Sequence, residues 1–215
     1  MSLYIPPSFA VKDRAAIVRL IHDYPFATLV TPAAPEPWVS HIPLLMTDAG
    51  EPHGTLIGHF ARANPHWQHA RDAQSIAIFH GPHAYVSPSW YTEPTQAVPT
   101  WNFTAVHAHG PLEIFDDAEA TRSVLDALVR RFEGARPAPW KLAMPDRQRD
   151  ALVSAIVAFK MPIRRLDAKF KLSQNRTRDD RVRVIAALKA EGYSEATETA
   201  EWMQAYAGIG DGHTG

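Results

Sequence analysis

The feature that most constrains the fold is a series of short β-type runs in the first half of the chain. The runs are Phe26–Thr31, Trp38–Leu45, Thr55–Phe60 and Ser75–Phe79. Turn-forming stretches rich in proline and glycine, such as PAAPEP and DAGEPHG, separate them. Short strands at this spacing are typical of a sheet that curls into a barrel. We therefore predict a β-barrel core.

Helical patterns lie mainly on either side of these strands. Apolar residues recur at helical spacing in several segments. We predict helices at Asp13–Tyr24, Asn64–Arg71, from Asp116 or Asp117 to Phe132, Asp146–Ile156, Asp179–Glu191 and Ser194–Tyr206. Asn64 is the expected N-cap of its helix, with Pro65 at the first helical position. Strands in the middle and helices at both ends predict an α+β fold.

Three further segments complete the pattern. His80–Thr100 contains prolines at 82, 88, 94 and 99, which predict an ordered but irregular loop over a pocket. Trp101–Phe115 has strand character, with an interruption at Gly110–Pro111. Val157–Leu172 is predicted to form one or two strands with a break near Met161–Pro162. The glycine-rich end, GIGDGHTG, is expected to fray.

Composition excludes several classes of protein. The 215 residues are 46% hydrophobic and 21% charged, which is a globular composition, and the net charge is only −1. Cysteine is absent, so disulfides, cysteine-bound metals and thiol catalysis are excluded. The sequence shows no signal peptide and no apolar run long enough to span a bilayer. We therefore expect a cytoplasmic protein that does not bind membranes.

Two segments are candidates for binding phosphate. The first, Gly58–Trp67, runs from a strand into a helix start, and Arg62 adds a fixed fork of donors. The second, Arg164–Arg183, has eight basic and three acidic residues. The alternatives are a helix cap with a surface arginine for the first segment, and a solvated connection for the second.

Histidines and aromatic residues give two further hypotheses. Nine of the 11 histidines lie between His41 and His109, yet no HExxH motif or neighbouring carboxylate pair accompanies them, so no metal site is expected. Aromatic residues could stack on a planar ring, although core packing is the commoner role. These residues are Tyr85, Trp90, Tyr91, Trp101 and Phe103. Together with phosphate donors they favour a nucleotide-like cofactor.

Several blocks make the chain resemble a known family, the PaiB-type FMN-binding negative transcriptional regulators. The blocks are YIPP from Tyr4, HGTL with GH and ARANP within 53–65, GPHAYVSPSWY at 81–91, VPTWN with VHAHG within 98–110, and KFKLSQNR at 169–176. Together they extend from residue 3 to about 188, and the tail from Ala190 onward lies outside the resemblance.

The resemblance implies a split β-barrel of the flavin-reductase or pyridoxamine-phosphate-oxidase type with flanking helices. It implies a homodimer that binds FMN at the subunit interface and regulates transcription negatively, as a repressor. The candidate phosphate contacts are His59, Arg62 and Asn64, and the candidate ring contacts are Trp101 and Asn102. Further polar contacts are expected from Lys171, Ser173, Gln174 and Asn175. The lysine that follows the arginine in the pyridoxamine-oxidase pattern is missing here.

Alternatives remain open at this point. The protein could be an FMN-dependent oxidoreductase or a haem-binding enzyme of the same barrel class, or a dimer whose ancestral site is empty. DNA contact is either direct, through the basic segment, or indirect, through a ligand or partner. We expect residues 1–190 to form a single split-barrel domain and residues 191–215 to form a C-terminal helix and a disordered tail.

Overall fold

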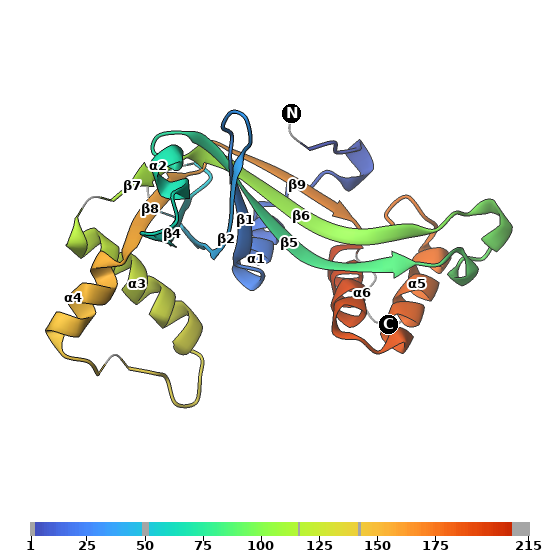
Figure 1. Ribbon diagram of the computed structural model, residues 1–215. Helices are drawn as coiled ribbons and strands as arrows, with labels where there is room; N and C mark the ends of the chain where they lie inside the picture. Colours follow the sequence, from blue (N-terminus) through green and yellow to red (C-terminus); the bar gives the residue numbers. More distant parts are fainter. Residues whose placement is uncertain (1–2, 49–51, 116, 142, 208–215) are drawn as a thin grey trace. The chain divides into compact units, whose positions relative to one another are not determined.

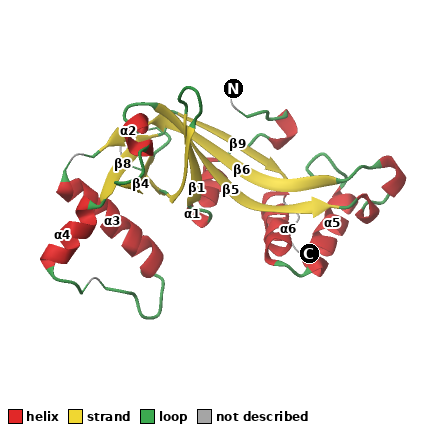
Figure 2. Ribbon diagram, viewed as in Figure 1, coloured by secondary structure: helices red, strands yellow, loops and turns green. Residues whose placement is uncertain are grey.

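The computed structural model describes residues 3–48, 52–115, 117–141 and 143–207. The helices are α1 (Arg14–Asp23), α2 (His66–Ala70), α3 (Ala118–Glu133), α4 (Asp146–Ser154), α5 (Arg178–Glu191) and α6 (Ser194–Ala207). The strands are β1 (Phe26–Thr31), β2 (Trp38–Pro43), β3 (Leu45–Thr47), β4 (Thr55–Ala61), β5 (Gln74–Val86), β6 (Thr100–Pro111), β7 (Glu113–Ile114), β8 (Ile156–Pro162) and β9 (Arg165–Lys171). Short 3-10 helices lie at Pro7–Phe9, Pro88–Trp90 and Pro94–Gln96. The predicted α+β class is confirmed (Figures 1 and 2).

The strands form two sheets, in the orders β2-β1-β5-β6-β9 and β3-β4-β8-β7. By the density of its contacts the chain divides into two compact units. The first unit comprises residues 1–20, 80–106 and 167–215, and the second comprises residues 21–79 and 107–166. Both β5 and β6 contribute residues to each unit. The single-domain boundary at residue 190 therefore stays a prediction, and the GIGDGHTG tail lies outside the described residues.

In the second unit, α3 packs against the four-stranded sheet. Strands β4 and β8 pair antiparallel along their length, with Gly58 opposite Phe159 and His59 opposite Ala158. Val124 and Leu128 of α3 bury against Ala158, and Leu45 and Ile57 pack around them. Asp117 caps α3 by accepting a hydrogen bond from the Ala120 amide at 2.6 Å. Of the apolar residues whose spacing predicts α3, Val124 and Leu128 cover the sheet, whereas Val129 and Phe132 are exposed.

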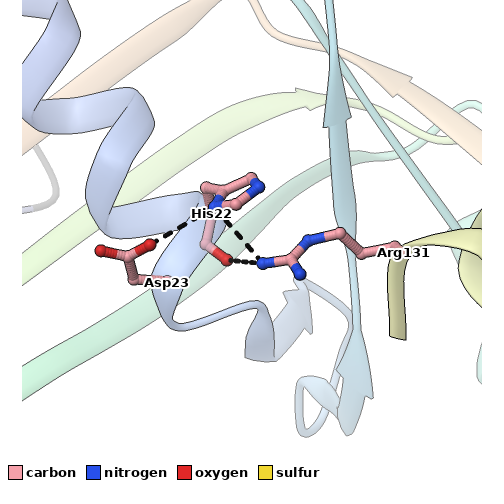
Figure 3. A network of polar contacts seen from close by, with 3 residues as sticks. All are labelled: His22, Asp23 and Arg131. Atoms are coloured by element: carbon pink, nitrogen blue, oxygen red, sulfur yellow. Dashed lines mark hydrogen bonds and ion pairs between the residues drawn. The ribbon is translucent and has the colours of Figure 1, made fainter. Parts of the chain in front are cut away.

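The last turn of α3 is also tied to the end of α1 (Figure 3). Arg131 Nη2 donates to the His22 carbonyl at 2.8 Å and lies 3.3 Å from His22 Nδ1. Asp23 Oδ1 lies 3.3 Å from the same ring nitrogen. A cation at a helix C-terminus meets unsatisfied carbonyls, so this contact stabilises both helix ends.

In the first unit, strands β5, β6 and β9 bury one face and expose the other. Alternate residues are buried, among them Ala84, Val86, Asn102, Ala168 and Phe170. Helices α5 and α6 pack on each other in this unit (Figure 1). Phe170 meets Trp202 and Tyr206 of α6, with ring centroids 5.4 and 5.2 Å apart. The opposite face carries His83, Tyr85 and Trp101, which are exposed.

Several predicted boundaries were wrong. The irregular loop begins later than predicted, because β5 continues to Val86 through Pro82. A proline is compatible with a strand where its missing N–H is not needed. The break between β8 and β9 falls at residues 163–164, and Ile156 begins β8 rather than ending α4. Helix α2 begins at His66, after Pro65, and Asn64 still caps its start because its Oδ1 accepts a hydrogen bond from the His66 amide at 3.0 Å. In α5 the helical spacing predicts that Val182, Ile185, Ala186 and Leu188 face inward. Ile185 and Leu188 are buried together with Val184, whereas Val182 and Ala186 are exposed.

Gly110, the glycine of the VHAHG block, stands where a side chain would clash with the neighbouring strand. A Cβ built on Gly110 would lie 2.1 Å from the Pro162 carbonyl oxygen, which no real side chain tolerates. The neighbouring Arg164 amide donates to the His109 carbonyl at 2.8 Å. The end of β6 therefore lies against the end of β8 only because residue 110 lacks a side chain.

Candidate functional site

His59 points toward the face of the second unit's sheet that α3 covers. It lies two residues after Ile57 on β4, so the two side chains share a face, and Ile57 packs against the α3 cluster. Its Nδ1 is buried without a hydrogen-bond partner in the described part of the chain. Burial lowers the pKa of His59, which favours a neutral ring. His59 is therefore a neutral donor or acceptor with one nitrogen unused.

Arg62 holds the junction between α4 and β8. Its Nε donates to the Ser154 carbonyl at 2.5 Å, and its Nη2 donates to the Ile156 carbonyl at 2.9 Å. The same side chain lines a pocket of about 320 Å³ in the second unit, together with Arg71 and Arg122. Three guanidinium groups beside one pocket favour an anion such as phosphate. Asp117 and Asp150 also line this pocket and offset part of that charge.

Asn64 belongs to a buried polar network rather than to an open pocket. Its Nδ2 donates to Ser40 Oγ at 3.0 Å, and its Oδ1 accepts from the His66 amide at 3.0 Å. His66 is completely buried, with Nδ1 2.8 Å from Ser40 Oγ and Nε2 2.8 Å from Thr31 Oγ1. Burial, with a smaller contribution from His69, lowers the pKa of His66 to about 4. The amide of Asn64 therefore anchors the start of α2.

Trp101 and Lys171 come together on the exposed sheet face of the first unit. Trp101 is 53% exposed, and the rings of His83 and Tyr85 lie with centroids 6.1 Å from its own. Lys171 Nζ donates to the Trp101 carbonyl at 2.7 Å and to Thr100 Oγ1 at 2.6 Å. Burial, followed by the charge of Lys169, lowers the pKa of Lys171. This face offers a planar aromatic surface beside ammonium groups.

Asn102 and Ser173 lie on the buried side of the same strands. Asn102 Nδ2 donates to Ser173 Oγ at 2.9 Å and contacts Met203 Sδ at 3.3 Å. Ser173 has a φ of 63°, so its backbone is in the left-handed region. Both side chains are almost fully buried. This arrangement makes them internal supports and places neither at the exposed face that holds Trp101.

Gln174 also satisfies the backbone, whereas Asn175 faces solvent. Gln174 Oε1 accepts from the Leu172 amide at 2.7 Å, and its Nε2 donates to the Phe170 carbonyl at 2.6 Å. These two bonds close the end of β9 before α5 begins. Asn175 is exposed at the tip of this turn. Of the polar residues predicted after Lys171, only Asn175 presents its side chain outward.

The sequence alone does not single out His66 or His83. The place of His66 after an Asn-Pro helix start is a signal that could have found it. His83 shares the exposed face with Trp101, Lys169 and the predicted aromatic residue Tyr85, which period-two alternation along β5 and β9 indicates. Lys169 Nζ lies 5.2 Å from the Phe103 ring centroid and 5.5 Å from that of Tyr4.

Two kinds of feature, a cluster of metal ligands and a membrane-spanning helix, are absent from the described ranges. Residues 3–48, 52–115, 117–141 and 143–207 contain no group of three or more histidine, cysteine or carboxylate side chains placed to hold a metal ion. The rings of His107 and His109 lie 6.4 Å apart, and Arg165 Nη2 approaches His109 Nε2 at 3.2 Å. None of the helices in these ranges combines the length and apolarity needed to cross a bilayer.

Comparison with known proteins identifies the family. The model of the family described as "Putative FMN-binding domain" matches residues 3–165. The chain belongs to this family. It is also 33% identical over 205 residues to the Bacillus subtilis "Protease synthase and sporulation protein PAI 2", covering 94% of this chain and 97% of that protein. An uncharacterized protein of Aspergillus fumigatus is 32% identical, over 88% of this chain and 92% of its own. The predicted membership of the PaiB-type family is confirmed.

Solved structures confirm the split β-barrel. An FAD- and haem-binding protein from Mycobacterium smegmatis matches with a TM-score of 0.60 and 17% identity, over 86% of this chain and 80% of its own. A second match is a Bacteroides thetaiotaomicron protein described as a "putative 5-nitroimidazole antibiotic resistance protein". Its TM-score is 0.55 and its sequence identity 16%, over 74% of this chain and 85% of its own. At sequence identities of 16% and 17%, the comparison shows that the fold is shared and nothing about function.

The residues present fit a flavin nucleotide in their chemistry. The ring system of FMN requires a planar apolar surface, and the exposed Trp101 and Tyr85 rings in the first unit provide one. Its phosphate requires cationic donors, and Lys171 provides one on the same face of the first unit. The missing lysine after Arg62 leaves arginine as the main cation of that segment.

Proposed function

We propose that this protein is an FMN-binding negative regulator of transcription that acts as a homodimer. The observation that carries the proposal is the family match over residues 3–165, which includes both the Arg62 segment and the Trp101 face. The Bacillus subtilis relative supports the regulatory part, since it is named for protease synthesis and sporulation and aligns over nearly its whole length.

The proposed flavin contacts are fewer than the sequence predicted. Trp101 stacks on the flavin ring, Lys171 contributes a cation, and Asn175 is available as an exposed polar contact. Bound flavin would supply redox chemistry, whereas these residues bind and orient it. Arg62 stays a separate candidate for binding phosphate or another anion, in the cationic pocket of the second unit.

The remaining predicted contacts act as supports in this proposal. Asn64, Asn102, Ser173 and Gln174 each make hydrogen bonds within the chain, so they position the segments that carry the contacts. His59 keeps an unpartnered buried nitrogen but lies on the face covered by α3. We assign it no direct contact with the flavin.

The homodimer proposal rests on the exposed apolar side chains of the first unit. Trp101 and Tyr85 on the sheet face are 53% and 40% exposed, and the ring of Tyr4, 81% exposed, lies 5.5 Å from Lys169 Nζ of the same face. Large apolar side chains gathered on an exposed face are typical of an interaction surface. A second copy covering this face would remove them from water. The absence of cysteine is compatible with the proposed cytoplasmic location.

Flavin titration tests the cofactor part with a matched pair of tryptophans. Trp101 and Trp140 are 53% and 52% exposed, but only Trp101 lies on the proposed flavin face. FMN fluorescence should be quenched by the unsubstituted protein and by Trp140→Ala, and Trp101→Ala should bind at least about tenfold more weakly. Equal quenching by both variants would remove Trp101 from the site. Absence of quenching at high protein concentration would refute the cofactor.

Two further measurements separate the alternatives. The visible absorption spectrum of the purified protein distinguishes a flavin from the Soret band of haem, and a Soret band would favour the haem-binding alternative. Light scattering should give about twice the chain mass of 23.9 kDa, whereas a monomer would refute the dimer. A gel-shift titration at several salt concentrations tests direct DNA contact, since binding through phosphates must weaken as salt rises. If the protein bound DNA at none of these salt concentrations, regulation through a ligand or a protein partner would remain.

A further inference from the structure

The helix pair α3 and α4, with the loop that joins them, encloses a second pocket that no flavin contact uses. Its volume is about 360 Å³, and it lies wholly within the second unit. The apolar side chains that line it are Leu125, Val129, Trp140, Met144, Leu152 and Ile156. Pockets of 300–1,000 Å³ with apolar walls are typical of sites for small organic ligands. Val153 and Arg122 line both this pocket and the Arg62 pocket, whereas Trp101, Lys171 and Arg62 itself do not line it.

The loop between the two helices is held in place on α3. Glu133, the last residue of α3, accepts a hydrogen bond from the Trp140 amide at 2.9 Å. Its other oxygen pairs with Arg136 Nε at 3.2 Å. Both contacts fix the loop beside the end of the helix. The Trp140 ring, which is 52% exposed, therefore forms one wall of the pocket in a defined place.

The charged groups of the pocket are compensated from within the chain. Arg122 pairs with Asp150 at 2.6 Å, and Arg149 pairs with Asp146 at 2.9 Å. Asp126, the other charged lining residue, is exposed to solvent. An anionic ligand would be desolvated without gaining an unpaired cation, and a cationic ligand would meet only the solvated carboxylate of Asp126. The lining therefore favours an uncharged ligand.

One polar group remains to orient such a ligand. Arg149 Nε is buried and has no hydrogen-bond partner within the described part of the chain. A buried donor without an acceptor costs free energy until an acceptor reaches it. The Arg149 side chain lines the pocket, so a small rotation brings this N–H to a ligand oxygen.

We propose that the α3–α4 pocket binds an uncharged molecule of one or two rings that carries a carbonyl acceptor for Arg149. This site shares no residue with the exposed sheet face that carries Trp101, and it does not rest on the proposed function. A regulator with two such sites would respond to a small apolar molecule as well as to its cofactor.

Prodan, an uncharged naphthalene with a ketone, is a suitable probe because its emission shifts to the blue in apolar surroundings. We expect a saturable blue shift with the unsubstituted protein in the absence of FMN. Anilinonaphthalene sulfonate, an anion of similar size, should bind at least about tenfold more weakly. Tighter binding of the anion would refute the preference for an uncharged ligand.

Two variants with matched controls locate the binding. Leu152→Glu places a charge on the pocket wall, at a residue that is 56% exposed. Its control, Phe132→Glu, places a charge on α3 outside the pocket, at a residue that is 40% exposed. Only Leu152→Glu should weaken prodan binding, by about tenfold. Because both residues are exposed, both variants should fold, which a thermal melt verifies.

Arg149→Lys keeps the charge but removes the Nε donor, and Arg147→Lys on the same helix is its control. Arg149→Lys should weaken prodan binding about fivefold to tenfold, and Arg147→Lys should not. Unchanged affinity in both Leu152→Glu and Arg149→Lys would overturn the proposal. So would displacement of prodan by saturating FMN, or its loss in Trp101→Ala, because either result would place the probe on the flavin face. Failure of FMN to bind leaves the prodan result unaffected.

Discussion

The exposed sheet face of the first unit and the α3-covered sheet face of the second unit have similar sequence patterns and opposite surroundings. On the first, alternation leaves Trp101 and Tyr85 partly in solvent. On the second, the same alternation places Ile57 and His59 beneath α3, and His59 loses water from one ring nitrogen. An aromatic or imidazole ring becomes a binding group only where no helix covers its face.

The clearest way to sharpen this comparison is to remove a buried histidine and an exposed one from the same helix. His66→Ala removes one hydrogen-bond partner from each of Ser40 and Thr31 and opens a cavity, so we expect a loss of about 3 kcal/mol in the free energy of unfolding. Urea denaturation measures it. His69→Ala, which removes only a stacking contact on Trp38, should cost about 1 kcal/mol or less. Equal losses would contradict the assigned role of His66.

Adjacent residues on β6 test the two faces of one strand. Asn102→Ala breaks a buried pair with Ser173 and should lower the free energy of unfolding by about 2 kcal/mol. Trp101→Ala should change it by about 0.5 kcal/mol while it weakens FMN binding, because its ring faces outward. Urea melts of both variants decide this. If Trp101→Ala proved the more destabilising, the exposed face would be part of the folded core.

Acid should destabilise the second unit first. The pKa of His66 is about 4 in the folded chain and 6.5 ordinarily, so the unfolded chain binds a proton at a higher pH. The stability that neutral His66 contributes is complete above pH 6.5 and is lost as the pH falls toward 4. The total is up to about 3 kcal/mol. Urea melts across this range measure it, and the same pH dependence in His66→Ala would assign the effect elsewhere.

The first unit should show a smaller effect at lower pH. The pKa of Asp180 lies below its ordinary value of 3.8, mainly because the Thr92 amide donates to it at 2.8 Å. Its contribution is present above that value and is lost as the pH falls through the lower folded pKa. Asp180→Asn should remove this acid step without changing the one at His66. Urea melts of Asp180→Asn and His66→Ala at a series of pH values measure the two acid steps. If each substitution altered both steps, the two units would unfold as one.

Much of the fold was predictable because local chemistry decided it. The run Phe26–Thr31 became β1 with the expected bounds, and Asp117 caps α3. The continuation of β5 through Pro82 was not predictable, since it depends on which ladder positions need an N–H. The same is true of Val182 in α5, which has suitable spacing but faces solvent.

The candidate site was predictable as a set of segments, but the role of each residue was not. The sequence predicted that the Arg62 and KFKLSQNR segments carry donors, and the structure has donors there. Asn64, Asn102, Ser173 and Gln174 nevertheless make hydrogen bonds within the chain. Residue type states what a side chain can bond to, whereas only its surroundings state whether a partner is already present.

The sequence by itself therefore determined the family, the α+β class, most strands and helices, and the exclusion of thiol chemistry. The family follows from the resemblance of whole sequence blocks, whereas the other properties follow from local periodicity, turn residues and composition, which act over short stretches of chain. Tertiary structure alone decided that Trp101 is exposed, that His66 is buried and neutral, and that α3 and α4 enclose an apolar pocket. Each of these depends on contacts between residues far apart in the sequence, because burial and pKa are set by neighbours in space.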